Sequence, residues 1–477
     1  GIFMNGFTFQ HAAPETQGVP SGAVSEWVRL ISELDTVHSF MLMRHDKIIA
    51  QAWWSPCRPE YKHELFSLSK SFTSAAIGIA QAEGCLRIDD RLAGFFPEKI
   101  SAAVSERMKR VTLRHLLTMS SGHETCPMSE LRPRRDWVKG FLESSLAFEP
   151  GTRFVYNSAA TYMLASVIRR TTGQNVLDYL QERLLHPLGI DAHQWDCCPM
   201  GTNVGGWGFW LRTEDLLRFG RLLQHNGNWE GRQLIPSDYL REATSKQIDN
   251  SDNAQPDWEL GYGFQFWRTS FNSFRADGAC GQYVLVMPEQ DLVLAVTSGV
   301  SNMQSILTHF WNTVYPALRE TALEENPEAR KQLENLLATR EIPPVSSTLT
   351  QQPRDREYHA APNTTGLGKL VFRFTGQNCT IVLQWEDGRR EEVTAQYGIH
   401  TRNLLQLDEE EIRILEASAA WADDRTLHVQ VCAVETPYRD LYIFRFLGNA
   451  LEFDRKSNFG FLHKIWPRIT ALEEKHG

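Results

Sequence analysis

The sequence predicts a mixed α/β (α+β) fold that is followed by a mostly β domain. Helical and strand patterns alternate from the N-terminal end to about residue 340. A break rich in proline and serine follows at 342–353, and beyond it only short strand patterns separated by turns remain. Since 477 residues exceed the size at which one core keeps growing, we expect two domains, residues 1–342 and 343–477.

The first domain is expected to begin with a β-hairpin and a buried helix. Two β-rich runs, 39–43 and 48–54, are separated by a turn that contains His45 and Asp46. A helix then begins at Ser67 and ends near Gly84. Shorter helical patterns, closed or capped by glycine or by polar residues, lie at 111–122, 159–170 and 213–222.

Strand patterns become more frequent toward the C-terminal half. Closely spaced β-branched and aromatic residues predict strands at 261–268, 283–287 and 292–297. Helical periodicity returns at 303–315 and 324–340. In the second domain, short strands are expected at 369–374, 380–385, 392–396, 411–415, 427–431 and 441–446.

The composition argues against several classes of function. The net charge of −9 and the lack of a long basic run disfavour a nucleic-acid partner. No run of eighteen apolar residues predicts a membrane span, and the first residues lack the pattern of an export signal, so we expect a cytoplasmic protein. The eight cysteines are scattered, as reduced thiols are. Neither His-x-His nor His-Glu-x-x-His occurs, so we expect no metal and no cofactor.

The chemistry of the chain is first indicated by Ser67-Leu68-Ser69-Lys70, the only Ser-x-x-Lys tetrapeptide in the sequence. Residues three apart on a helix share a face, so the Lys70 amine should lie beside the Ser67 hydroxyl. The apolar residues that follow predict a buried helix, and burial lowers the pKa of a lysine. Lys70 could then accept the Ser67 proton, which makes Ser67 a candidate nucleophile. The alternative is that Ser67 caps an ordinary core helix and Lys70 extends to solvent.

A second candidate element is Tyr156-Asn157-Ser158, the only Tyr-x-Ser or Tyr-x-Asn in the chain. A tyrosine held between cations can have a lowered phenol pKa, and it can then exchange protons with a serine or a leaving group. The alternative is a half-buried aromatic residue whose hydroxyl bonds to the backbone. His115 and His123 are interpreted as structural histidines.

Together these motifs resemble the serine β-lactamase and penicillin-recognising family, and they are most similar to its class C and esterase-like branch. Ser-x-x-Lys, the run His-Leu-Leu-Thr-Met-Ser-Ser-Gly at 115–122, Tyr-x-Ser and a glycine-rich turn before a strand follow the family's order. The resemblance covers residues 10–320. It implies an antiparallel sheet flanked by helices, with an all-helical subdomain inserted after the Ser67 helix.

The resemblance also implies a role for each matching residue. Ser67 would form an acyl-enzyme, Lys70 would activate it, and Tyr156 would relay protons. Ser158 would bind substrate or Lys70. The oxyanion hole would use the backbone amides of Ser67 and Ala279, and Gly278 would contribute to substrate binding beside Ala279.

One segment departs from the family pattern. Where β-lactamases carry Lys-Thr-Gly or His-Thr-Gly, this chain has Ala276-Asp277-Gly278. An alanine supplies no cation for a β-lactam carboxylate, and Asp277 would repel it. The segment resembles instead esterase and amide-hydrolase members, including the 6-aminohexanoate-oligomer hydrolases.

These observations predict a metal-independent serine hydrolase that acts on a small ester, amide or peptide through an acyl-enzyme on Ser67. One alternative is penicillin-binding, D-peptidase or β-lactamase activity. Another is a catalytically silent binding or sensor module on the same scaffold. The sequence does not indicate the oligomeric state.

Overall fold

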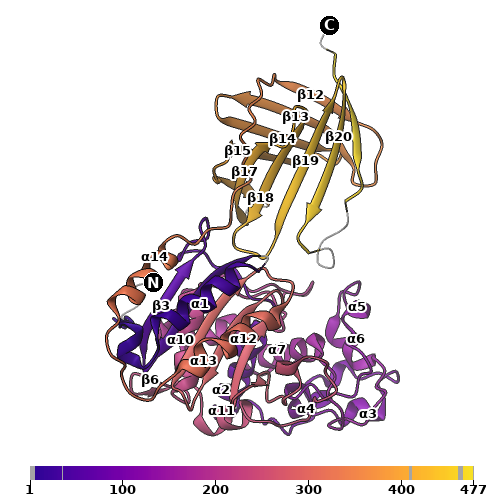
Figure 1. The fold of residues 1–477 in the computed structure, drawn as a ribbon. Helices are drawn as coiled ribbons and strands as arrows, with labels where there is room; N and C mark the ends of the chain where they lie inside the picture. Colours follow the sequence, from indigo (N-terminus) through magenta and orange to yellow (C-terminus); the bar gives the residue numbers. More distant parts are fainter. Residues whose placement is uncertain (1–5, 35, 408–410, 460–465, 476–477) are drawn as a thin grey trace. The chain divides into compact units, whose positions relative to one another are not determined.

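The computed structural model describes residues 6–34, 36–407, 411–459 and 466–475 (Figure 1). The chain divides into two units, each with its own hydrophobic core. Unit 1 comprises residues 1–53 and 62–340, and unit 2 comprises 54–61 and 341–477. Among the described residues, no helix is both long and apolar enough to cross a membrane.

Unit 1 contains a seven-stranded sheet in the order β1-β3-β2-β11-β10-β9-β8. Every neighbouring pair is antiparallel except β1 and β3. Strands β2, β10 and β11 are buried along their whole length, which indicates that both faces of the sheet are covered. The strands are β1 (Gln10–His11), β2 (Val37–Arg44), β3 (Lys47–Trp53), β8 (Trp267–Thr269), β9 (Ser273–Gly278), β10 (Gln282–Met287) and β11 (Leu292–Ser298).

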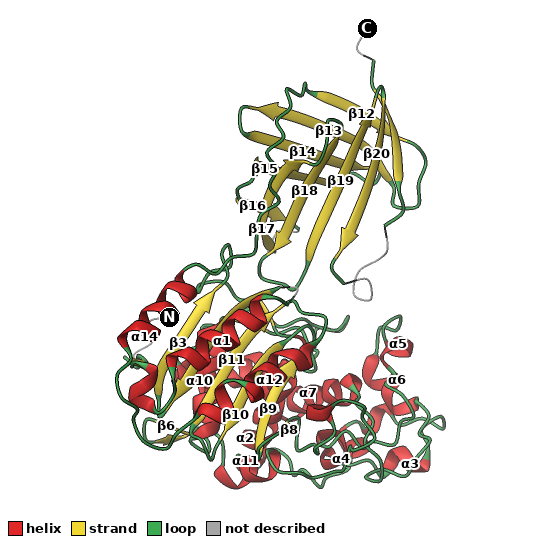
Figure 2. Cartoon of the chain, in the orientation of Figure 1, coloured by secondary structure: helices red, strands yellow, loops and turns green. Residues whose placement is uncertain are grey.

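Helices cover the two faces of this sheet (Figure 2). On one face, Trp27 of α1 (Ser21–Ser32) packs edge-on against Phe40 of β2 and Phe310 of α12 (Met303–Asn312). On the other, α10 (Thr213–Gln224) approaches so closely that a Cβ on Gly220 would overlap Val293. Helices α13 (Val314–Ala317) and α14 (Pro327–Ala338) pack against α1, and α11 (Ser237–Ala243) packs against α2 (Ser69–Ala82).

A helical part follows the Ser67 segment in the chain. Its central helices are α2 (Ser69–Ala82) and α7 (Ser158–Thr172), which pack on each other and are buried over most of their length. Around them lie α3 (Glu106–Lys109), α4 (Leu113–Leu117), α5 (Met128–Leu131), α6 (Trp137–Glu143), α8 (Val176–Leu180) and α9 (His186–Leu188). Two short strand pairs complete the unit, β4 (His63–Glu64) with β5 (Trp210–Leu211) and β6 (Asn228–Trp229) with β7 (Arg232–Gln233).

Unit 2 is a ten-stranded sheet in the order β15-β14-β13-β12-β21-β20-β19-β18-β17-β16. An additional pairing between β15 and β17 closes the sheet on itself. The strands are β12 (Arg356–Ala360), β13 (Leu367–Thr375), β14 (Asn378–Trp385), β15 (Arg390–Tyr397), β16 (Thr401–Gln406), β17 (Ile412–Trp421), β18 (Thr426–Ala433), β19 (Arg439–Leu447), β20 (Ala450–Ser457) and β21 (Ile469–Glu473).

A short segment from early in the chain, Trp54–Tyr61, belongs to unit 2. The amide of Ile342 donates to the carbonyl of Ser55 at 2.8 Å, and the guanidinium of Arg402 lies over the ring of Tyr61. The chain therefore enters unit 2 once before it reaches Ser67 and returns to it after residue 340.

The structure confirms the mixed α/β class with a C-terminal β-rich part. Three predicted elements are wrong in detail. The helix expected at 111–122 is only α4, Leu113–Leu117, because Met119 takes a left-handed backbone conformation (φ +57°). The strand expected at 261–268 is reduced to β8, because Gly261 and Gln265 take left-handed backbone conformations (φ +111° and +69°) that interrupt an extended run. The helix expected at 303–315 breaks at Thr313 into α12 and α13.

Candidate active site

Ser67 lies on a 3₁₀ turn, Phe66–Leu68, that leads directly into α2. The sequence predicted a helix from Ser67 onward, and the α-helix begins two residues later. Residues three apart across a helical turn share a face, so Ser67 on the 3₁₀ turn and Lys70 in the first turn of α2 lie side by side. The preceding Phe66 has φ +50°, an uncommon conformation for a bulky residue that is found at strained functional turns.

Lys70 is enclosed by three oxygen partners. Its Nζ lies 2.8 Å from Ser67 Oγ, 2.9 Å from Ser158 Oγ and 2.8 Å from the carbonyl oxygen of Gly206. The residue is 2% exposed, and burial lowers the pKa of its amine to about 7. A neutral amine donates two hydrogen bonds, which suits Gly206 and Ser158, and its lone pair then faces the Ser67 hydroxyl.

Tyr156 approaches Ser67 from the loop before α7. Its hydroxyl is hydrogen-bonded to Ser67, and its ring lies 4.8 Å from Lys70 Nζ. On the sequence we expected a lowered phenol pKa. The structure shows the opposite: burial, with a smaller contribution from the charge of Asp277, raises the pKa of Tyr156 well above its usual value. The phenol therefore stays protonated in this site.

Ser158 is placed by the start of α7. Asn157 caps this helix by accepting from the amide of Ala160, and its own amide group bonds toward Ser121 and His123. The cap fixes the first turn of α7 and so directs Ser158 toward Lys70. His123 bridges Ser121 and Ser144, and the side chain of His115 completes the cap of α4, so both histidines hold the backbone in place.

Gly278 ends β9 beside the Ser67 turn. A Cβ at this position would overlap the carbonyl oxygen of Leu65 and lie 3.1 Å from the amide nitrogen of Leu68. This close approach requires glycine and brings Ala279 next to the nucleophile turn. The following turn is held by Gln282, whose amide group donates to the carbonyls of Ala279 and Ser298.

Asp277 forms a buried ion pair with Arg275 on its own strand. Its Oδ2 lies 2.8 Å from Nε of Arg275, and both residues are buried, at 6% and 0% exposed. Burial raises the pKa of Asp277, while the neighbouring Arg275 opposes that rise. The sequence did not reveal this ion pair, although the Arg-x-Asp spacing on a strand places both side chains on one face.

Comparison with known proteins now decides the family. The family model described as Beta-lactamase matches residues 27–307, which is more than half of the chain. The chain belongs to the beta-lactamase family. A curated member, the Beta-lactamase of Escherichia coli K12, is 24% identical over 156 residues. That match spans 32% of this chain and 40% of the relative.

Solved structures of the same fold agree with this assignment. A Bacillus anthracis protein described as a 6-aminohexanoate-dimer hydrolase has a TM-score of 0.54 at 19% identity, covering 69% of this chain and 88% of its own. A penicillin-binding protein homologue from Pyrococcus abyssi has a TM-score of 0.52 at 15% identity. That match covers 94% of this chain and 99% of the homologue. A family VIII carboxylesterase has a TM-score of 0.50 at 17% sequence identity. That match covers 65% of this chain and 100% of the carboxylesterase. At these identities the likeness concerns the fold.

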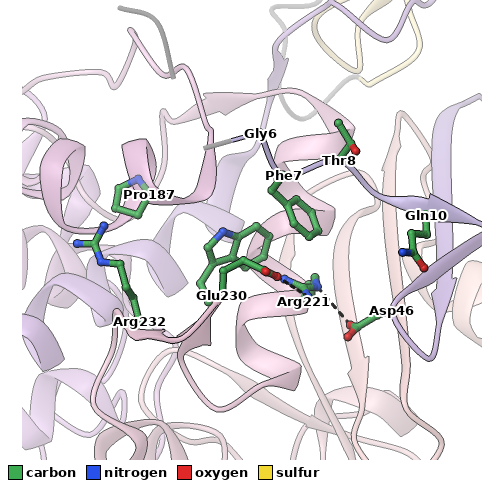
Figure 3. A pocket seen from close by; sticks show the side chains of 10 residues that line it. Gly6, Phe7, Thr8, Gln10, Asp46, Pro187, Arg221, Glu230 and Arg232 are labelled. Carbon is green, nitrogen blue, oxygen red and sulfur yellow. Dashed lines mark hydrogen bonds and ion pairs between the residues drawn. The ribbon is translucent and has the colours of Figure 1, made fainter. Parts of the chain in front are cut away.

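Within this beta-lactamase family member, Ser67, Lys70, Tyr156 and Ser158 form one cluster, with Gly278 against the turn that carries Ser67. A separate cavity of about 760 Å³ opens beside Phe7 and Trp229 (Figure 3). None of the cluster residues lines it, and its central Arg221 is already paired with Asp46 and Glu230. The Ser67 cluster therefore lies outside this cavity.

Proposed function

We propose that this protein is a metal-independent serine hydrolase that forms an acyl-enzyme on Ser67 with a small ester or amide. The observation that carries the proposal is the position of Ser67 Oγ, which lies 2.8 Å from a buried lysine amine and bonds to a protonated tyrosine. A base and an acid thus meet at one hydroxyl.

In the proposed acylation, the Lys70 amine takes the Ser67 proton while Oγ bonds to the substrate carbonyl carbon. The amides of Ser67 and Ala279 stabilise the resulting oxyanion. Tyr156 gives its proton to the leaving group as the bond to that group breaks, and the Lys70 ammonium reprotonates Tyr156. Water then attacks the acyl carbon and gives a proton to the neutral Lys70 amine. As the bond from that carbon to Ser67 Oγ breaks, the Lys70 ammonium protonates Oγ, and the acid product leaves.

The substrate is proposed to be uncharged around the scissile bond. Asp277 occupies the strand position where a carboxylate-binding residue would be needed for a β-lactam, and Ala276 offers no cation. An anionic group placed there would meet the Asp277 carboxylate across a buried, low-dielectric space. Esters and amides without such a group meet no such repulsion.

Intact-protein mass spectrometry after exposure to a fluorophosphonate tests the proposal. We expect one adduct, which Ser67→Ala abolishes and Ser71→Ala retains. Ser71 is a matched control because it lies on α2, four residues after Ser67, and its hydroxyl donates to the carbonyl of Gln265. If the folded protein forms no fluorophosphonate adduct at Ser67, the proposal that it is a serine hydrolase is refuted. A long-lived adduct after exposure to a penicillin would favour the penicillin-binding alternative.

A further inference from the structure

The ring of Tyr156 lies between two partners. Lys70 Nζ lies 4.8 Å from the ring centroid, and the indole of Trp267 stacks on the ring with centroids 5.4 Å apart and planes inclined by 27°. Trp267 is the first residue of the edge strand β8 and is buried. The orientation of the Tyr156 hydroxyl toward Ser67 thus depends on where the Trp267 ring is held.

Trp267 is held by a buried polar network on the neighbouring strand. Its indole bonds to the Asp277 carboxylate, and Arg275, directly opposite Trp267 in the β8–β9 pairing, lies 5.7 Å from its ring. Arg275 bonds in turn to Asp277 and, at 2.8 Å, to Thr269 Oγ1. The indole N–H is the only donor of a tryptophan side chain, so this bond fixes the ring about its long axis.

A buried ion pair is a weak source of stability, because desolvation offsets the attraction between the charges. What such a pair does supply is a defined geometry, since every donor must meet its acceptor. In the pair Arg275–Asp277, Nε of Arg275 bonds to Asp277 and Nη1 bonds to Thr269. The pair is buried, it lies beside the Ser67 cluster, and it ends on the residue that stacks on Tyr156.

We propose that Asp277 and Trp267 are positioning residues that hold the Tyr156 hydroxyl in line with Ser67. In this chain the β9 segment therefore serves the proton donor instead of binding a substrate carboxylate. The inference rests on the proposed role of Tyr156 as the acid, and the following experiment separates the two.

A double-mutant cycle between Trp267→Phe and Tyr156→Phe tests the coupling, with kcat and KM measured on a p-nitrophenyl ester. Trp267→Phe keeps an aromatic ring that can stack on Tyr156, but it loses the indole N–H that donates a hydrogen bond to Asp277. We expect kcat to fall by about ten- to a hundredfold, as for a misplaced catalytic group, with KM unchanged within about twofold. In the Tyr156→Phe background, which lacks the hydroxyl, the same substitution should have no further effect.

The matched control is Trp258→Phe. Trp258 lies 4.2 Å from the Arg275 guanidinium and packs edge-on against Trp267, but among the described ring contacts it does not touch Tyr156. This variant should keep kcat within about twofold, because it alters the aromatic cluster without releasing the Trp267 indole.

Three results would overturn the inference: an unchanged kcat in Trp267→Phe, an equal loss in both backgrounds, or an equal loss in Trp258→Phe. Full activity in Tyr156→Phe would instead refute the proposed acid. Circular dichroism establishes that each variant is folded. Should Trp267→Phe not fold, the same cycle is made with Asp277→Asn, which keeps the side-chain volume and removes the charge that anchors the pair.

Discussion

At the scale of single residues, the site depends on two opposite shifts of pKa. Burial lowers the pKa of Lys70 to about 7, and burial with the charge of Asp277 raises that of Tyr156. In the proposed mechanism the two groups therefore act as a base and an acid at one hydroxyl, as in other sites where environment assigns the roles of two titratable groups. The apolar pattern after Ser67 predicts the lowered pKa of Lys70, whereas the raised pKa of Tyr156 is visible only in the folded structure.

The activity should therefore rise with pH through neutrality. Acylation needs the neutral amine of Lys70, which is populated only above its pKa of about 7. We expect kcat/KM for a p-nitrophenyl ester to increase from pH 6 to pH 8 and then level off, because Tyr156 keeps its proton throughout that range. A pH–rate profile corrected for spontaneous hydrolysis measures this. A profile that falls over the same range would show that Lys70 acts in its charged form.

At the scale of elements, the site is assembled where the end of β9 meets the turn before α2. The contact depends on Gly278, since any side chain there would overlap the carbonyl oxygen of Leu65. The turn after β9 is fixed by Gln282, which bonds to both Ala279 and Ser298. Strand, turn and helix thus support one another. A displacement at their contact should also move the backbone amides of Ser67 and Ala279, which we propose as oxyanion donors.

Gly278→Ala should consequently disable the enzyme. Displacing β9 from the turn would misplace the proposed donor at Ala279, and loss of one such donor costs about a hundred- to a thousandfold in kcat. The measurement is kcat on a p-nitrophenyl ester together with the melting temperature. Gly22→Ala is the matched control, because a Cβ there meets nothing within 4 Å and should leave activity unchanged. Activity within twofold of wild type in Gly278→Ala would contradict this account of the contact.

For the molecule as a whole, the two units do not follow one another along the chain, because each is built from two separate segments. Residues 54–61 precede the nucleophile turn in sequence yet belong to the unit that otherwise begins at 341. Cys57 in this segment is buried, and burial raises the pKa of its thiol well above the usual value, with smaller contributions from Cys432 and Glu416 of the same unit. The thiol should therefore react only when unit 2 opens.

Thiol labelling across a urea titration tests this assignment. Cys57 should become reactive at the same urea concentration as Cys379 and Cys432, which are buried in unit 2, and not with Cys198, which is buried in unit 1. Peptide mass spectrometry after a pulse of maleimide gives the labelled fraction at each site. Exposure of Cys57 together with Cys198 would place residues 54–61 with unit 1.

The sequence by itself determined what local spacing encodes. Ser67 and Lys70 lie three positions apart, so their contact follows from one turn of backbone, and the strand and helix classes follow from the periodicity of apolar residues. The glycine at 278 was singled out from the family resemblance, and the structure supplies its physical reason.

Only the tertiary structure decided what depends on segments distant in the chain. The Gly206 carbonyl that binds Lys70, the Trp267 ring that stacks on Tyr156 and the membership of Trp54–Tyr61 in unit 2 all arise from contacts between such segments. The direction of the Tyr156 pKa shift was mispredicted for the same reason, since burial and the neighbouring Asp277 are set by packing. A residue's type and its near neighbours fix its possible chemistry, while its solvation and distant partners are properties of the folded chain.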